Sequence, residues 1–102
     1  MDVFTAIADP TRRELLRALS AGPQTVNELA AASGALQPSV SKHLKALLEA
    51  GLVTRSVEGP RRIYALAPDG LTELDDWLVR LRTQWTDRLD ALEAHLGRSD
   101  TP

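Results

Sequence analysis

Cysteine is absent from the 102 residues of this chain, which excludes disulfide bonds, thiolate metal ligands and cysteine nucleophiles together. No apolar run approaches the roughly 18 residues that a transmembrane helix needs. Residues 1–5 lack the basic and apolar stretches of a secretory signal, and no internal repeat or low-complexity segment is present. We therefore expect a cytoplasmic protein with no membrane partner and no cofactor.

The charged residues are unevenly distributed, although the formal net charge is only −2. Residues 1–65 carry eight basic and six acidic side chains, whereas residues 66–102 carry four basic and eight acidic ones. The excess of basic residues is concentrated between positions 36 and 65. This pattern is typical of a protein with two functionally different ends. A chance fluctuation over a short window is the alternative explanation.

Four short helices are predicted within residues 3–50, because apolar side chains recur there three or four positions apart. Thr25 and Glu28 form the spacing of a capping box at the start of the third helix. Gly34 supplies a left-handed stop before the fourth. Two short helices joined by a tight turn make residues 25–50 a helix-turn-helix.

The second half of the chain predicts a hairpin and one long helix. Two β-prone runs within residues 52–66 flank the turn-forming Glu58-Gly59-Pro60, which indicates a two-stranded wing. A helix is expected over residues 70–96, followed by a flexible tail at 97–102. The fold class is mainly α with a small β-hairpin, a winged helix-turn-helix in a single domain over residues 1–96, dimeric through its terminal helices.

The fourth helix has an apolar stripe on one side and polar or basic residues on the other. Short polar side chains can hydrogen-bond base edges in a major groove, and lysines can neutralise phosphates. An ordinary solvated helix face is the alternative, and for the histidine a structural role is equally open. The candidate DNA-contacting residues of this helix are Gln37, Ser39, Ser41, Lys42, His43 and Lys45.

The predicted wing carries three arginines, Arg55 on one strand and Arg61 and Arg62 beside the turn on the other. Guanidinium groups at such a position can lie along a DNA backbone or enter a narrow minor groove. Taken alone, the arginines also fit an edge strand that is charged to prevent aggregation. A helix-turn-helix and a basic wing together favour binding of double-stranded DNA.

The C-terminal helix has an apolar seam that the remainder of so short a chain cannot cover while also forming its own core. Two copies that pair their terminal helices would bury it, with Trp77 and Trp85 as anchors, whereas packing within one chain is the alternative. Leu96 is the last residue of the seam. The expected contacts of this homodimer are Phe4, Leu74, Leu78, Leu81, Trp85, Leu89 and Leu92.

Three stretches resemble the ArsR-type family of winged-helix repressors: ADPTRR at residues 8–13, QPSVSKHLK at 37–45 and GPRRIYAL at 59–66. The resemblance implies a homodimer that binds an operator and often represses its own promoter. It places Ser39, Ser41, Lys42 and His43 on the recognition helix, and Arg61 and Arg62 on the wing. One departure is Leu36, which stands where the family usually has a polar N-cap.

The resemblance to this family also raises the question of metal sensing. Metal-sensing members carry cysteines on the third helix, where residues 27–32 here have none, or a paired site across the terminal helices, where only His95 near Glu93 is available. Residues 77–93 are similar to a metal-independent branch, so we expect no metal site and no metal effector. No catalytic grouping indicates an enzyme. A winged-helix protein-interaction or dimerisation module without DNA binding is the alternative function.

Overall fold

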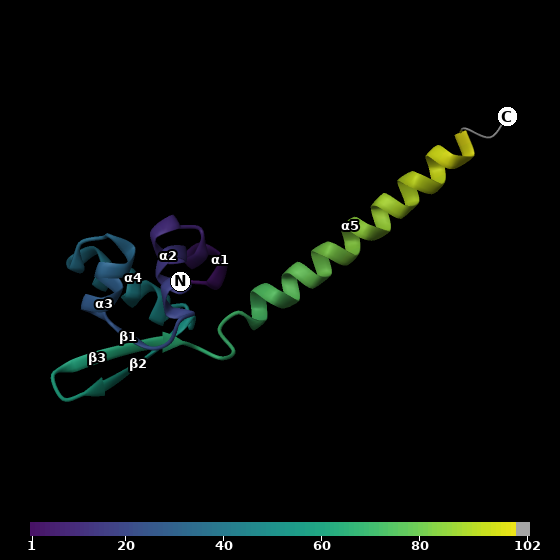
Figure 1. Cartoon of the computed structure of the whole chain (residues 1–102). Coiled ribbons are helices and arrows are strands. Elements are labelled where there is room, and N and C mark those ends of the chain that lie inside the picture. The colour runs from purple at the N-terminus through teal and green to yellow at the C-terminus, as the bar shows by residue number, and fades with distance from the viewer. Residues whose placement is uncertain (100–102) are drawn as a thin grey trace. The chain divides into compact units, whose positions relative to one another are not determined.

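The computed structural model describes residues 1–99 and confirms a mainly helical chain with a small antiparallel sheet. The elements in chain order (Figure 1) are α1 (Val3–Ile7), α2 (Pro10–Leu19), β1 (Gln24–Thr25), α3 (Val26–Ser33), α4 (Gln37–Glu49), β2 (Val53–Glu58), β3 (Arg61–Leu66) and α5 (Thr72–Ser99). They fall into two compact units, Met1–Leu71 and a second that begins at Thr72. The single domain over residues 1–96 stays a prediction.

Capping side chains define where the helices of the first unit begin. Asp9 accepts the backbone N–H of Arg12 at 3.1 Å and starts α2. At α3 the predicted capping box is confirmed, since Glu28 donates its backbone N–H to the Thr25 hydroxyl and its carboxylate accepts the Thr25 N–H at 3.0 Å. Gly34 ends α3 at a φ of +71°, a left-handed conformation that glycine adopts without strain.

The start of α4 has no side-chain cap, because Leu36 occupies the N-cap position and cannot accept a backbone N–H. Pro38 lies within the first turn, where its missing N–H costs nothing. The start of this helix therefore depends on backbone geometry and on the packing of the apolar stripe, without help from a capping side chain.

The core of the first unit consists mainly of leucine and valine side chains, which point inward from the helices and from the start of a strand. On α4, Val40, Leu44 and Leu47 are completely buried, which confirms the predicted stripe. Their spacing of four and three positions places them on one side of the helix. The largest fully buried side chains of the unit are Leu15, Leu29, Val40, Leu44, Leu47 and Leu52.

The sheet has three strands in the order β1-β3-β2, all antiparallel, instead of the predicted two-stranded hairpin. The additional strand β1 pairs Gln24 with Tyr64 and Thr25 with Ile63. It contains only two residues, so it shows no alternation of apolar and polar side chains that sequence periodicity could detect. The pairing joins the base of the hairpin to the residues that cap α3.

The second unit is a single helix, α5, which continues to Ser99. The helix thus continues three residues beyond the expected end at residue 96, because no proline stops it there. The flexible tail over residues 97–102 stays a prediction. The remaining tail residues 100–102 lie outside the described part of the chain. Within residues 1–99, no helix combines the length and apolarity needed to cross a membrane.

Candidate nucleic-acid interface

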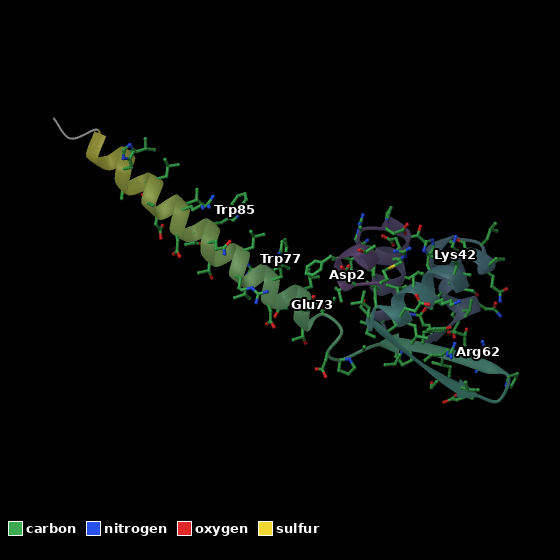
Figure 2. The ribbon with its side chains drawn as sticks, turned by 180° about the vertical axis from the view of Figure 1, so that it is seen from behind. Asp2, Lys42, Arg62, Glu73, Trp77 and Trp85 are labelled. Carbon is green, nitrogen blue, oxygen red and sulfur yellow. The ribbon has the colours of Figure 1, made fainter. Side chains whose placement is uncertain are left out.

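The side of α4 opposite its buried stripe is exposed and carries the predicted polar and basic residues. Gln37, Ser41, Lys42 and Lys45 are exposed, whereas Ser39 is half-buried. Figure 2 shows Lys42 on this helix and Arg62 on the hairpin within the same unit. Burial of Val40 and Leu44 therefore fixes the rotation of the helix, and that rotation presents the lysines to solvent.

His43 is half-buried and is held by a residue that sequence reasoning did not include in the site. The Arg12 Nε–H donates to His43 Nδ1 at 3.2 Å, joining α2 to α4. The pKa of Asp9 is lowered, chiefly because its carboxylate accepts the backbone N–H of Arg12. The only available signal was the position of Arg12 inside the ADPTRR stretch.

The three wing arginines are all exposed but do not share one face of the hairpin. Arg55 pairs with Tyr64 and Val57 pairs with Arg62 across β2 and β3. Because paired residues and alternate residues lie on the same side of a sheet, Arg55 and Arg62 share a face. Arg61 is adjacent to Arg62 in sequence and projects from the opposite face.

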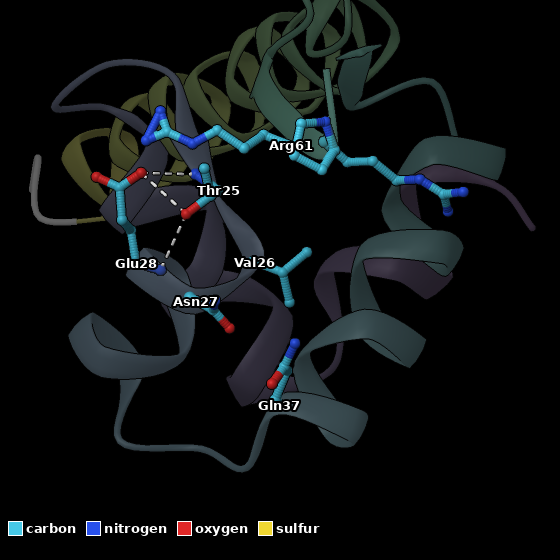
Figure 3. Close-up of a pocket in the computed structure, with 8 residues that line it drawn as sticks. Thr25, Val26, Asn27, Glu28, Gln37 and Arg61 are labelled. Atoms are coloured by element: carbon cyan, nitrogen blue, oxygen red, sulfur yellow. Dashed lines mark hydrogen bonds between the residues drawn. The ribbon is translucent and has the colours of Figure 1, made fainter. Parts of the chain in front are cut away.

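A hollow of about 460 Å³ lies between the first turn of α3, the start of α4 and the wing (Figure 3). The residues that line it are Thr25, Val26, Asn27, Glu28, Gln37, Pro60, Arg61 and Arg62. The hollow brings the predicted Gln37, Arg61 and Arg62 together with polar residues of α3. Thr25 and Asn27 were missed by sequence reasoning, because only the pairing of β1 with β3 brings them beside the wing.

Glu28 is a negative charge within this mainly polar hollow. Its pKa is lowered, first because its carboxylate accepts the Thr25 backbone N–H, second because it accepts the Thr25 hydroxyl, and to a smaller extent because of the positive charge of Arg61. The carboxylate therefore offsets part of the Arg61 charge, whereas no such effect is shown for Arg62.

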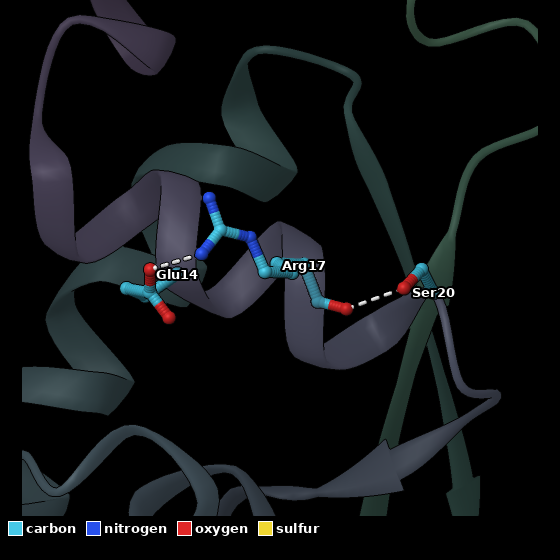
Figure 4. A network of polar contacts seen from close by, with 3 residues as sticks. All are labelled: Glu14, Arg17 and Ser20. Carbon is cyan, nitrogen blue, oxygen red and sulfur yellow. Dashed lines mark hydrogen bonds and ion pairs between the residues drawn. The ribbon is translucent and has the colours of Figure 1, made fainter.

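Arg17 on α2 is exposed but belongs neither to the polar face of α4 nor to the wing. The Arg17 guanidinium pairs with Glu14 at 2.9 Å, one turn earlier on the helix, and Ser20 donates its hydroxyl to the Arg17 carbonyl (Figure 4). An exposed pair of this kind contributes less than about 1 kcal/mol. Arg17 was not predicted to contact DNA, and it provides a charge-matched control for the residues that were.

The predicted dimer residues of α5 form one continuous apolar stripe. Leu74, Trp85 and Leu96 are eleven positions apart, as are Leu78 and Leu89. An eleven-residue repeat corresponds to about 3.67 residues per turn, close to the 3.6 of a straight α-helix. The stripe therefore stays on one side of the helix along its whole length.

The α5 stripe is largely open to solvent in the single chain. Trp85 is 62% exposed and Leu89 is 59% exposed, and Figure 2 shows Trp77 and Trp85 projecting from the helix. Leu74 and Leu81 are half-buried, and so is Phe4 on α1. Single apolar residues on a surface are common, whereas a stripe of this length is typical of a helix that packs against another surface.

A helix-turn-helix with an exposed polar and basic recognition face, beside a hairpin rich in arginine, defines the class of winged-helix DNA-binding regulators. Residues 9–55 match the model of the bacterial regulatory proteins of the arsR family. The chain belongs to this ArsR family. It is a DNA-binding transcriptional regulator with the predicted winged helix-turn-helix fold, and it is not an enzyme.

Three curated relatives illustrate the family. The HTH-type transcriptional regulator Rv2034 of Mycobacterium tuberculosis is 41% identical over 92 residues, which cover 86% of each chain. The transcriptional repressor SdpR of Bacillus subtilis is 33% identical over 76% of this chain and 87% of its own. A probable mercury resistance operon repressor of Streptomyces lividans is 35% identical over 70% of this chain and 57% of its own.

Two solved structures are similar over most of the chain. A possible transcriptional regulator for arsenical resistance has a TM-score of 0.73 and 43% identity, over 93% of this chain and 96% of that one. The homodimeric winged helix-turn-helix DNA-binding domain Mb0332 of Mycobacterium bovis, a possible ArsR-family regulator, has a TM-score of 0.65 and 28% identity. This similarity covers 84% of this chain and 80% of that domain.

Proposed function

We propose that this protein is a homodimeric repressor that binds a two-fold symmetric operator in double-stranded DNA at its own or a neighbouring promoter. The observation that carries the proposal is the orientation of α4, whose Leu44 is fully buried while Lys42 and Lys45 are exposed. Ser39 and Ser41 on the same helix supply hydrogen bonds for reading base edges. A regulator of this kind acts in the cytoplasm, where bacterial DNA is found.

The proposed dimer is formed through the α5 stripe, with Phe4 of α1 contributing. Burial of apolar surface supplies about 25 cal/mol per Å² before the cost of association, and Trp85 lies at the centre of the stripe between Leu74 and Leu96. The homodimeric state of Mb0332 supports this assembly. A two-fold dimer can present two recognition helices about 34 Å apart, which matches successive major grooves.

We also propose that the repressor responds to no metal ion, unlike a relative named for mercury resistance. The sequence contains no cysteine, and residues 27–32 of α3 offer only one acidic side chain. Among the described residues, no three His, Cys, Asp or Glu side chains are grouped closely enough to hold a metal. Zinc or mercury should therefore leave DNA binding unchanged, which fluorescence anisotropy with and without the ion would measure.

DNA binding is tested with a duplex that the protein enriches from a random-sequence library. We expect binding that weakens steeply with salt, because lysines and arginines displace counterions from phosphates. Lys42→Ala with Lys45→Ala should weaken binding to all sequences and flatten the salt dependence, whereas Arg17→Ala should change it little. If the library yields no enriched sequence and micromolar protein shows no salt-sensitive binding, the proposal is wrong.

A further inference from the structure

One hydrogen bond connects the recognition helix to the N-terminal helices. Arg12 on α2 donates its Nε–H to Nδ1 of His43 on α4, across 31 positions of sequence. Another nitrogen of the same guanidinium lies 3.4 Å from the carbonyl oxygen of Thr5 and 3.4 Å from the Met1 sulfur. Arg12 therefore hydrogen-bonds to α1 and α4 at once, and among the described residues of the recognition helix His43 is its one side-chain hydrogen-bond partner.

The donor in this hydrogen bond determines the state of the imidazole. A guanidinium has N–H groups but no acceptor, so His43 Nδ1 must supply a lone pair. A neutral imidazole carries a single N–H, which is then placed on Nε2. The second nitrogen of the His43 ring is thus a hydrogen-bond donor, and among the described residues it has no hydrogen-bond acceptor of its own.

The backbone from which Arg12 projects is itself fixed. Its N–H donates to the carboxylate of Asp9, the N-cap of α2, at 3.1 Å. This cap holds the first turn of the helix, so the Arg12 side chain starts from a defined position. Arg13, its neighbour, instead donates to the carbonyls of Ile7 and Ala8 at 2.8 and 3.0 Å, and among the described residues its side chain forms no hydrogen bond to α4.

We propose that Arg12 is a positioning residue of the DNA interface. By occupying Nδ1, it fixes His43 in the tautomer whose Nε2–H donates to an acceptor oxygen or nitrogen of the bound DNA. The acceptor is either a phosphate oxygen or the N7 or O6 atom of a purine in the major groove. This role rests on the proposed function, since it requires that α4 meets DNA.

The tautomer is tested without DNA by nuclear magnetic resonance of the imidazole nitrogens in the full chain. In the wild type, His43 should show an unprotonated Nδ1 and a protonated Nε2. Arg12→Gln should move the two ¹⁵N shifts toward each other, because the tautomers then interconvert. Arg13→Gln, which removes the same charge one position away, should leave them unchanged. Unchanged shifts in Arg12→Gln would overturn the proposal.

DNA binding by the full chain is tested with a double-mutant cycle on the enriched duplex. Arg12→Gln should weaken binding about fivefold more than Arg13→Gln, the effect of one hydrogen bond. In a His43→Ala background, Arg12→Gln and Arg13→Gln should weaken binding equally, since Arg12 acts through His43. An equal loss from Arg12→Gln in both backgrounds would overturn the proposal.

Two further comparisons complete the test. A loss that is the same on enriched and scrambled duplexes assigns the acceptor to a phosphate, whereas a loss confined to the enriched duplex assigns it to a base edge. Should Arg12→Gln unfold, Arg12→Met, which keeps a long unbranched side chain but has no N–H donor, should show the same changes. If wild type binds no DNA, the proposed function and the DNA role of Arg12 both fail, while the nitrogen shifts still decide the tautomer.

Discussion

The two units of this protein differ in whether their apolar side chains are buried or exposed. In residues 1–71, Leu44 on α4 is completely buried, whereas in the second unit Trp85 on α5 is 62% exposed. The first unit has a core of its own, and the exposed face of its recognition helix is polar and basic. The second has an apolar stripe and no core. The comparison supports the proposal that the second unit serves for association.

The largest expected effect comes from an experiment that truncates one leucine in each unit. Leu44→Ala should lower the free energy of unfolding by about 3 kcal/mol, because it leaves a cavity in a fully packed core. Leu89→Ala removes a side chain that is 59% exposed in the single chain, so it should not affect the unfolding of residues 1–71. Urea denaturation, followed at low protein concentration, measures both. Equal losses of unfolding free energy in Leu44→Ala and Leu89→Ala would contradict the division into two units.

The next effect concerns association. Trp85→Ala should weaken the proposed dimer about thirtyfold, the loss typical of a central aromatic contact. Arg80→Ala is the control, because five positions at 100° each place Arg80 on the far side of α5. Sedimentation equilibrium measures the dissociation constants. A wild-type protein that stays monomeric at tens of micromolar would contradict the proposed dimer.

A smaller effect distinguishes the two faces of the wing. Arg62→Ala should weaken DNA binding about tenfold, as expected for one lost charge-assisted contact, and reduce the salt slope by about one. Arg61→Ala should cost only about threefold, because Glu28 already offsets part of the Arg61 charge. Anisotropy titrations at several salt concentrations provide the measurement. Glu28→Gln should strengthen binding, and equal losses at both arginines would rule out this difference.

The smallest expected effect is on acid stability. The pKa values of Asp2, Asp9 and Glu28 are lowered by hydrogen bonds from backbone N–H groups at the helix starts, Thr5, Arg12 and Thr25 respectively. A carboxylate with a lowered native pKa stabilises the fold above its unfolded pKa, and this contribution is lost as pH falls through the native value. The free energy of unfolding should therefore be lower at about pH 3 than near neutrality, and this difference should be smaller in Glu28→Gln than in the wild type. Denaturation at the two pH values measures it.

Local patterns made much of the first unit predictable from sequence. The stripe of Val40, Leu44 and Leu47 and the capping box of Thr25 depend on residues three or four positions apart, so their spacing alone defines them. Exposure of the α4 lysines followed from the same stripe. Several of the predicted DNA contacts, such as Gln37 and Arg62, prove to line one hollow.

The features that sequence could not provide depend on contacts between distant residues. The hydrogen bond from Arg12 to His43 spans 31 positions, and neither residue shows a periodic signal for it. The strand β1 exists only because β3 pairs with it. The different faces of Arg61 and Arg62 required the register of the hairpin, which a turn sequence alone does not fix.

The pairing of β1 with β3 has a consequence for how the protein engages DNA. Because Thr25 both pairs with Ile63 and caps α3, a single residue joins the wing to the helix-turn-helix. A wing joined to the recognition helices in this way should lose less conformational entropy on binding a duplex than a freely hinged wing would lose.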